Sequence, residues 1–263
     1  MRSRSLWVCA LGVGLAVSVV ACGGGSKESS APAESAASTG QKVDPATAGD
    51  INGVVSFDGV APKNEPIKMN ADPVCVKANA TPQTQETYEV DNGKLANVFV
   101  YVKDGLGNYS YDPPAGPITI DQKGCRYHPH VFGIRVGQEL YSVNRDPTLH
   151  NIHALPKGNA EFNTGQPIQG MKTVHTFNAK EVMVPFKCDV HGWMNAYVGV
   201  VDNPYFAVTG ADGKFSLKGL PPGTYTIEAW HEKGGTQTAQ VTLGAKETKE
   251  ANFSFKAPAT ATD

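Results

Sequence analysis

The sequence has little of what helical or nucleic-acid-binding proteins need. No long stretch shows the helical spacing of apolar residues, and 28 glycines with 18 prolines indicate many turns. The formal net charge of −2 offers no attraction to phosphates, so we expect no nucleic-acid partner. Hydrophobic residues still make up 40% of the 263 residues, enough for a core. We therefore expect an all-β fold.

The N-terminus is predicted to be a targeting segment. Arg2 and Arg4 precede an apolar stretch over residues 6–20, which is shorter than the roughly 20 residues of a membrane helix. Residues 19–22 (Val-Val-Ala-Cys) resemble a bacterial lipobox. This resemblance implies a lipoprotein signal peptide at residues 1–21, removal of that peptide, and lipidation of Cys22. The alternative is an ordinary secretory signal cut near Ala21, with Cys22 an incidental thiol.

Residues 22–49 contain almost no large apolar side chains and are rich in Gly, Ser, Ala, Pro and Thr. Such a segment cannot form a core, so we expect a flexible linker. Over about 26 residues its root-mean-square reach is roughly 25–30 Å. We expect a protein in the periplasm or at the cell surface, lipid-anchored to a membrane. Gly23 after Cys22 favours the outer membrane, because an Asp there resembles an inner-membrane retention signal.

Cysteine is scarce, and its count is informative. Cys9 leaves with the signal peptide and Cys22 is assigned to lipid, which leaves Cys75, Cys125 and Cys188 in an oxidising compartment. An odd number suggests one disulfide and one thiol with another role. Because Cys188 is surrounded by metal-ligand side chains, Cys75 and Cys125 are the candidate disulfide.

Cys125 has one alternative use. Residues 125–130 read Cys-Arg-Tyr-His-Pro-His, which could hold a second metal cluster with His128 and His130. We favour the disulfide. His175 and His231 have no comparable neighbours, so we expect them to be structural or exposed.

Short strand patterns separated by turn signals recur along the chain. Residues 95–103 alternate well, with Val98, Val100 and Val102 on one face and Phe99 and Tyr101 on the other. Residues 65–86 look irregular. The expected strands lie at residues 52–57, 95–103, 118–121, 131–136, 140–144, 181–188, 196–201, 206–209, 214–218, 224–230, 238–243 and 250–255.

Potential metal ligands are densest at residues 187–194 (Lys-Cys-Asp-Val-His-Gly-Trp-Met), just after a predicted strand. Soft sulfur favours Cu(I), imidazole suits both oxidation states, and a weak axial thioether tunes the potential. A fourth ligand must come from elsewhere, and residues 146–151 (Asp-Pro-Thr-Leu-His-Asn) can supply it. The pattern predicts one copper ion, cycling between Cu(I) and Cu(II), held by His150, Cys188, His191 and Met194.

These motifs resemble the cupredoxin family of blue copper proteins. Cys-x2-His-x2-Met looks like the ligand loop of amicyanin and is a shorter relative of the plastocyanin and pseudoazurin loops. Tyr127-x-Pro129 and His150-Asn151 are similar to the segment before the first histidine in those proteins. The resemblance covers residues 117–203.

The cupredoxin resemblance implies a role for each residue of the site. His150 and His191 would be the imidazole ligands, Cys188 the thiolate and Met194 the axial ligand. Asn151 would lie in the second shell and hydrogen-bond the two ligand segments together. His153 is an alternative ligand in place of His150, and the two residues face opposite sides of a strand.

The C-terminal third resembles a carboxypeptidase regulatory-like (transthyretin-like) β-sandwich. The resemblance rests on residues 208–217, with an Asp-Gly turn, and on the Pro-Pro-Gly that begins at Pro221. Gly53-Val54-Val55 and Val98-Phe99-Val100 match the start of such a domain but lie before the cupredoxin segment. We therefore expect a cupredoxin at 113–203 inserted into a sandwich of 50–112 and 204–256, with a tail at 257–263. Three consecutive modules are the alternative.

The expected function is a membrane-tethered carrier of single electrons between extracytoplasmic redox partner proteins, not an enzyme. The main alternative is a periplasmic copper-binding protein for transport or storage. A binuclear copper enzyme would need a second cysteine in the ligand loop, and an adhesion or carbohydrate-binding sandwich remains a further class. The cupredoxin resemblance implies an exposed edge of His191 as the electron entry point. Trp193 either packs against the site or contributes to hydrophobic docking.

Overall fold

The computed structural model describes residues 40–257. Within this part the structure is almost entirely β, and its one helix is the short α1 (Pro73–Ala78), so the expected all-β fold is confirmed. No helix of residues 40–257 has the length and apolarity to cross a membrane. The predicted signal peptide, Cys22 and the last six residues of the predicted tail lie outside the described residues.

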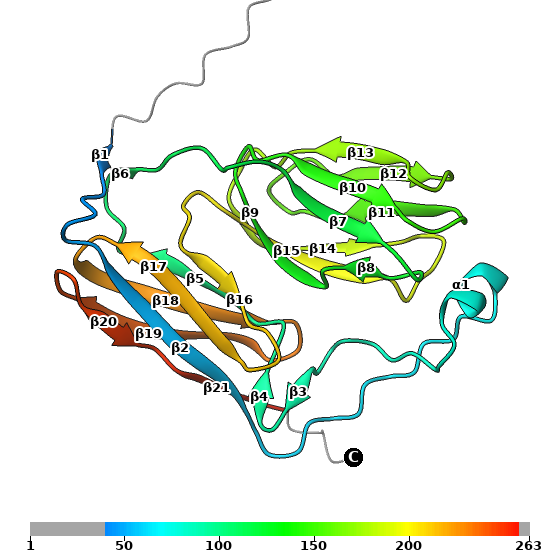
Figure 1. The fold of residues 1–263 in the computed structure, drawn as a ribbon, viewed down its shortest axis with the longest axis horizontal. Coiled ribbons are helices and arrows are strands. Elements are labelled where there is room, and N and C mark those ends of the chain that lie inside the picture. Colours follow the sequence, from blue (N-terminus) through cyan, green and yellow to red (C-terminus); the bar gives the residue numbers. More distant parts are fainter. Residues whose placement is uncertain (1–39, 258–263) are drawn as a thin grey trace, which may run out of the picture. The chain divides into compact units, whose positions relative to one another are not determined.

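The first β-sandwich draws its strands from both ends of the described chain (Figure 1). Its strands are β2 (Gly49–Asp58), β3 (Val90–Asp91), β4 (Lys94–Leu95), β5 (Phe99–Asp104), β16 (Phe206–Val208), β17 (Lys214–Leu220), β18 (Gly223–His231), β19 (Gly235–Leu243), β20 (Thr248–Glu250) and β21 (Phe253–Lys256). One sheet has the order β17-β2-β4-β3, with β20 and β21 also paired to β2. The other has the order β16-β5-β18-β19.

The second β-sandwich is continuous in sequence. Its strands are β7 (Ile118–Gln122), β8 (Tyr127–His128), β9 (Val131–Arg135), β10 (Leu140–Asn144), β11 (His150–Ala154), β12 (Phe162–Gln166), β13 (Lys172–His175), β14 (Glu181–Lys187) and β15 (Asn195–Val201). The sheets have the orders β13-β10-β7-β8 and β12-β11-β14-β15-β9. β14 and β11 are neighbours, and the residues predicted as ligands lie at the ends of these two strands.

Strand pairing bears on how the two sandwiches are connected. β5 pairs with β16 and β18, although the whole second sandwich separates them in sequence. We infer that the second sandwich is inserted between β5 and β16 of the first.

The end of the predicted flexible linker forms a strand. β1 (Gln41–Lys42) pairs in parallel with β6 (Tyr109–Ser110), and Lys42 contacts Asp112 at 2.5 Å.

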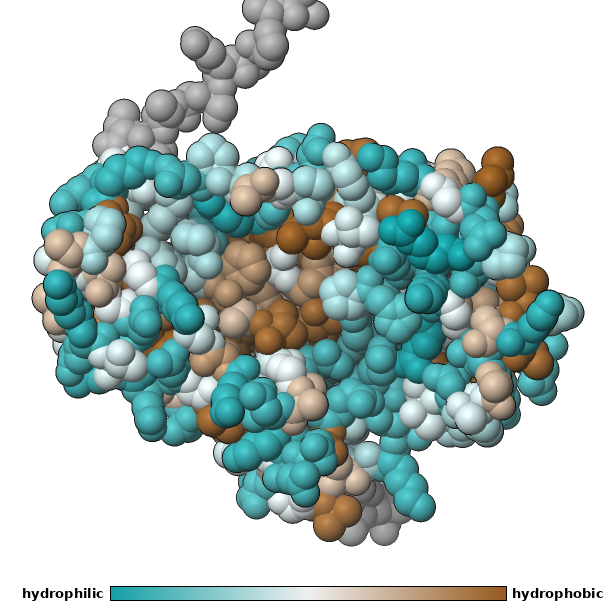
Figure 2. All heavy atoms as spheres, in the orientation of Figure 1, coloured by the Kyte–Doolittle hydropathy of each residue, from teal (hydrophilic) through white to brown (hydrophobic). Residues whose placement is uncertain are grey.

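The alternation in residues 95–103 gives β5 two apolar faces. Val98, Val100 and Val102 are fully buried in the core of the first sandwich. Phe99 and Tyr101 face the other way and pack with Val131 and Val201 of the second. Figure 2 shows hydrophobic atoms gathered at the centre of one face, amid hydrophilic side chains. An apolar contact between β5, β9 and β15 therefore joins the two sandwiches.

The ring of Phe99 lies on two paired glycines, Gly133 and Gly199. A Cβ atom at residue 199 would approach the Phe99 ring to 2.3 Å, so we expect Gly199→Ala to lower the free energy of unfolding by roughly 1–3 kcal/mol through overpacking. Gly165→Ala is the matched control, because a Cβ there meets nothing within 4 Å. Urea unfolding of both variants measures the difference, and equal stabilities would show that this contact tolerates an added methyl group.

The segment between β2 and β3, residues 59–89, leaves the first sandwich and carries α1 beside the second (Figure 1). We call it the cap segment. Asp72 is the N-cap residue of α1, where its side chain accepts a hydrogen bond from the Val74 N–H, and Pro73 fits the first turn. The sequence predicts irregular structure at residues 65–86, and α1 is the one helix that the structure shows there.

Candidate metal centre

The ligand loop after β14 is folded by its own backbone. The Cys188 N–H donates to the Met194 carbonyl (3.2 Å), and the Met194 N–H donates to the His191 carbonyl (2.9 Å). The His191 N–H also points at the Cys188 sulfur, 3.4 Å away. These bonds close a compact turn in which Cys188, His191 and Met194 are all buried.

His150, at the start of β11, meets this loop. Sidechain nitrogen and sulfur atoms of His150, Cys188 and His191 lie within 4.8 Å of one another. Nδ1 of His150 is 3.0 Å from Nδ1 of His191. His150 is 0% exposed, Cys188 1% and His191 3%, so water is excluded from the group. Met194 is 1% exposed and belongs to the same buried cluster as Cys188.

Each histidine has a carboxylate on its outer nitrogen. Nε2 of His150 donates to Asp146 Oδ2 at 2.9 Å, and Nε2 of His191 donates to Asp72 Oδ2 at 3.1 Å. With both Nε2 atoms protonated, both Nδ1 atoms present lone pairs to each other. Lone pairs 3.0 Å apart repel unless a proton or a metal ion lies between them. Because two nitrogens bound at about 2.0–2.1 Å to one ion have a similar separation, these residues fit a metal ion.

The electrostatics of the group favour a bound cation. Burial acts to raise the pKa of Cys188, yet hydrogen bonds from His150, Asn151 and His191 hold it below its ordinary value. Burial also acts to lower the pKa of His150, but the bonds to Asp146 and Cys188 raise it overall. A lowered pKa makes the thiolate, which is the form that binds metal, easier to form.

Asn151 connects the two ligand segments. Its Oδ1 accepts a hydrogen bond from the Asp189 N–H (2.7 Å) and lies 3.2 Å from the Cys188 sulfur. The Tyr127 hydroxyl lies within hydrogen-bonding distance of the carbonyls of Asn151 (2.5 Å) and Lys187 (2.9 Å). These contacts tie β11 to the end of β14, which is the role that the cupredoxin resemblance implies for Asn151.

His153, the alternative ligand, does not join the group. Its Nδ1 pairs with Asp189 at 2.9 Å and its Nε2 with Glu161 at 2.6 Å, on the outer side of β11. Lys187 and Asn163 hold the pKa of Asp189 well below its usual range, so this partner stays charged. Side-chain alternation along β11 turns residue 150 inward and residue 153 outward.

The structure joins Cys75 to Cys125 by a disulfide, the pairing that the sequence favours. The sulfur of Cys125 is therefore not a thiolate for the alternative metal cluster of residues 125–130. His130 is instead buried against Glu232 at 2.7 Å, and His128 is exposed. His175 stacks on Phe162, with ring centroids 3.8 Å apart.

The expectation of an exposed His191 edge is wrong. Asp72 of the cap segment accepts from its Nε2, and the Cys75 sulfur lies 3.6 Å from the same atom. Trp193 packs over the same region, with its ring centroid 5.0 Å from that of His191 and its Nε1 donating to the Cys125 carbonyl at 2.9 Å. The cap segment, not solvent, covers this histidine.

Two site residues escaped the sequence reasoning. Asp146 lies in the Asp-Pro motif that marks His150, and its position four residues before that histidine was an available signal. Asp72 had no signal, because it lies in the irregular cap segment, 119 residues before its partner His191.

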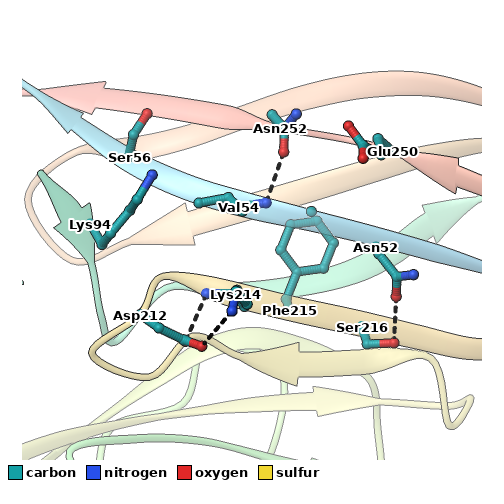
Figure 3. Close-up of a pocket in the computed structure, with 11 residues that line it drawn as sticks. Asn52, Val54, Ser56, Lys94, Asp212, Lys214, Phe215, Ser216, Glu250 and Asn252 are labelled. Carbon is teal, nitrogen blue, oxygen red and sulfur yellow. Dashed lines mark hydrogen bonds and ion pairs between the residues drawn. The ribbon is translucent and has the colours of Figure 1, made fainter.

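A groove of about 760 Å³ on the first sandwich lies away from these donors. Figure 3 shows two hydrogen bonds among its lining residues, with Ser216 donating to Asn52 at 2.6 Å and Asn252 accepting from the Val54 N–H at 2.8 Å. None of the candidate metal ligands lines it.

Comparison with known proteins adds two similarities. The family model of the carboxypeptidase regulatory-like domain matches residues 194–256. The match begins before β16 and includes β15, which hydrogen-bonds to β14 and β9 of the second sandwich. No curated protein matches the chain.

Similar solved structures include a copper-containing nitrite reductase, amicyanin variants and a purple cupredoxin, and each covers about a third of this chain. A copper-containing nitrite reductase from Thermus scotoductus SA-01 is 22% identical over 37% of this chain and 24% of its own, with a TM-score of 0.32. This chain therefore spans about a quarter of that enzyme. A reduced amicyanin variant is 22% identical over 34% and 86% (TM-score 0.29). A purple cupredoxin from Nitrosopumilus maritimus is 22% identical over 31% and 97% (TM-score 0.27).

Proposed function

We propose that this protein binds one copper ion through His150, Cys188, His191 and Met194 and carries single electrons between partners outside the cytoplasm. The observation that carries the proposal is the convergence of two imidazole Nδ1 atoms and one sulfur in a buried group. Copper bound there would supply a one-electron Cu(I)/Cu(II) couple. Tethering through Cys22 remains a prediction from the sequence.

The side chains around the donors support electron transfer over bond-making chemistry. Asp146 and Asp72 hold the two rings, and Asn151 holds the start of the ligand loop through the Asp189 N–H, so the donors are fixed by the fold. Fixed donors need little rearrangement when the charge of the ion changes. Burial excludes water from the donors, which favours a retained ion over one that is delivered to another protein.

Copper titration tests the proposal directly. We expect the metal-free protein to bind one equivalent of Cu(II) and to develop an intense thiolate-to-copper absorption band. His150→Ala should weaken or abolish that band because it removes an imidazole donor. His153→Ala is the matched control and should keep it, since His153 faces Asp189 and Glu161. If the band were lost in His153→Ala and kept in His150→Ala, the ligand would be His153 and the proposed role of His150 would be wrong.

A further inference from the structure

His191 meets a residue that lies outside the second sandwich. Asp72 belongs to the cap segment, which the first sandwich sends out between β2 and β3. Its Oδ2 accepts from His191 Nε2 at 3.1 Å and from the Thr148 hydroxyl at 2.7 Å. Its Oδ1 accepts from the Val74 N–H at 2.7 Å. One carboxylate thus connects α1, the segment before His150, and the ligand loop.

The cap segment is held firmly enough to fix this carboxylate. The disulfide from Cys75 to Cys125 joins α1 to the second sandwich, and Met69 packs into the same buried cluster as Met194. Arg126 and Glu86 form an ion pair at 3.0 Å, and Asn79 donates to the Gly124 carbonyl at 3.0 Å. Asp72 therefore approaches His191 from a fixed position and not from a free loop.

Asp72 accepts a hydrogen bond from Nε2 of His191 in the same way that Asp146 accepts one from Nε2 of His150. A carboxylate cannot donate a hydrogen bond when ionised, so the ring nitrogen facing it must carry the proton. The other ring nitrogen then offers its lone pair inward, and the choice of tautomer is set by the outer hydrogen bond. Because Asp146 lies four residues before His150, that carboxylate is local, whereas the one on His191 comes from the cap segment, 119 residues away in sequence.

We propose that Asp72 is a positioning residue of the metal centre: a carboxylate from the cap segment holds His191 in its Nε2–H tautomer, with Nδ1 facing Cys188 and His150. The inference rests on the proposed copper site and extends it. It assigns a task to the cap segment, which connects two strands of the first sandwich. Its negative charge also stabilises Cu(II) over Cu(I), since the oxidised ion carries one more positive charge.

The variant Asp72→Asn removes the acceptor that faces His191 and keeps the N-cap of α1, so it tests the two roles of Asp72 separately. Asn caps helices about as well as Asp, so its Oδ1 can still accept from the Val74 N–H. Its amide N–H groups would then face His191 Nε2, and two donors cannot share that contact. We expect the metal-free variant to invert the His191 tautomer, which nitrogen-15 NMR of the imidazole reports, while the unfolding midpoint stays unchanged.

The copper-loaded variant supplies the second readout. We expect Cu(II) affinity to fall roughly tenfold, in line with losses of outer hydrogen bonds to ligand histidines. We also expect the equilibrium constant for reduction to rise about tenfold, which is about 59 mV for a one-electron couple. Thr148→Val is the matched control. It removes another hydrogen bond of the same Asp72 oxygen but keeps the carboxylate, so the tautomer and the potential should stay as in the unsubstituted protein.

The outcomes distinguish this inference from the copper proposal. A wild-type protein that binds no copper overturns the proposed function, yet the tautomer of His191 can still be measured without metal. An unchanged His191 tautomer in Asp72→Asn overturns the positioning role. A lower unfolding midpoint with an unchanged tautomer gives Asp72 a purely structural role and overturns it as well.

Discussion

After copper loading, Cys188→Ser is expected to show no intense thiolate-to-copper band. Serine keeps the size of the side chain but replaces the polarisable sulfur with a hard oxygen, which is a poor ligand for Cu(I). Cys188 is the free cysteine of the described residues, so no second thiolate there can take its place. The absorption spectrum at one equivalent of Cu(II) measures the effect, and an undiminished band in this variant would remove Cys188 from the site.

The control for this prediction must remove both disulfide cysteines together. Cys125→Ser alone would leave Cys75 as a free thiol, and its sulfur lies 3.6 Å from His191 Nε2. That thiol could bind copper by itself and confuse the result. The double variant Cys75→Ala/Cys125→Ala carries no such thiol, and we expect it to keep the band.

The same double variant is expected to lose on the order of 4 kcal/mol of unfolding free energy. The bond joins residues 50 positions apart, and the chain-entropy estimate for a loop of that length is about 4 kcal/mol. Both cysteines are fully buried, so part of the loss also comes from packing beside Met69. Urea unfolding of the metal-free protein, followed by tryptophan fluorescence, measures the change.

Chemical reduction of the unsubstituted protein provides an independent arm of this experiment. It breaks the same bond without changing the sequence, so we expect a similar loss of stability. The cap segment should then be cut by protease before the second sandwich is, because the bond that fixes α1 is gone. Stability within about 1 kcal/mol of the unsubstituted, oxidised protein in both arms would contradict the entropic account.

Sequence reasoning worked best where a local rule applied. The alternation in residues 95–103 correctly separated the faces of Val98 and Phe99, because side chains in a strand alternate by necessity. The ligand loop could be proposed from the spacing of Cys188, His191 and Met194, since such a short turn keeps its side chains near one another. β12 and β13 were missed, because their residues lack the apolar alternation that marks a strand.

The choice between His150 and His153 needed more than alternation. The pattern shows that the two residues face opposite sides, but not which side faces the core. The pairing of β11 with β14 decides this, because it places His150 beside Cys188 and leaves His153 with Asp189 and Glu161.

The amino-acid order alone determined the β-rich character of this protein, the cysteine left outside the disulfide, and the loop that presents sulfur and imidazole together. These depend on composition and on neighbours within a few residues. Only the tertiary structure decided that Asp72 meets His191 and that the cap segment covers this histidine. The contact between Asp72 and His191 joins residues 119 positions apart, and no local pattern records it, because it depends on packing and a disulfide between the cap segment and the second sandwich.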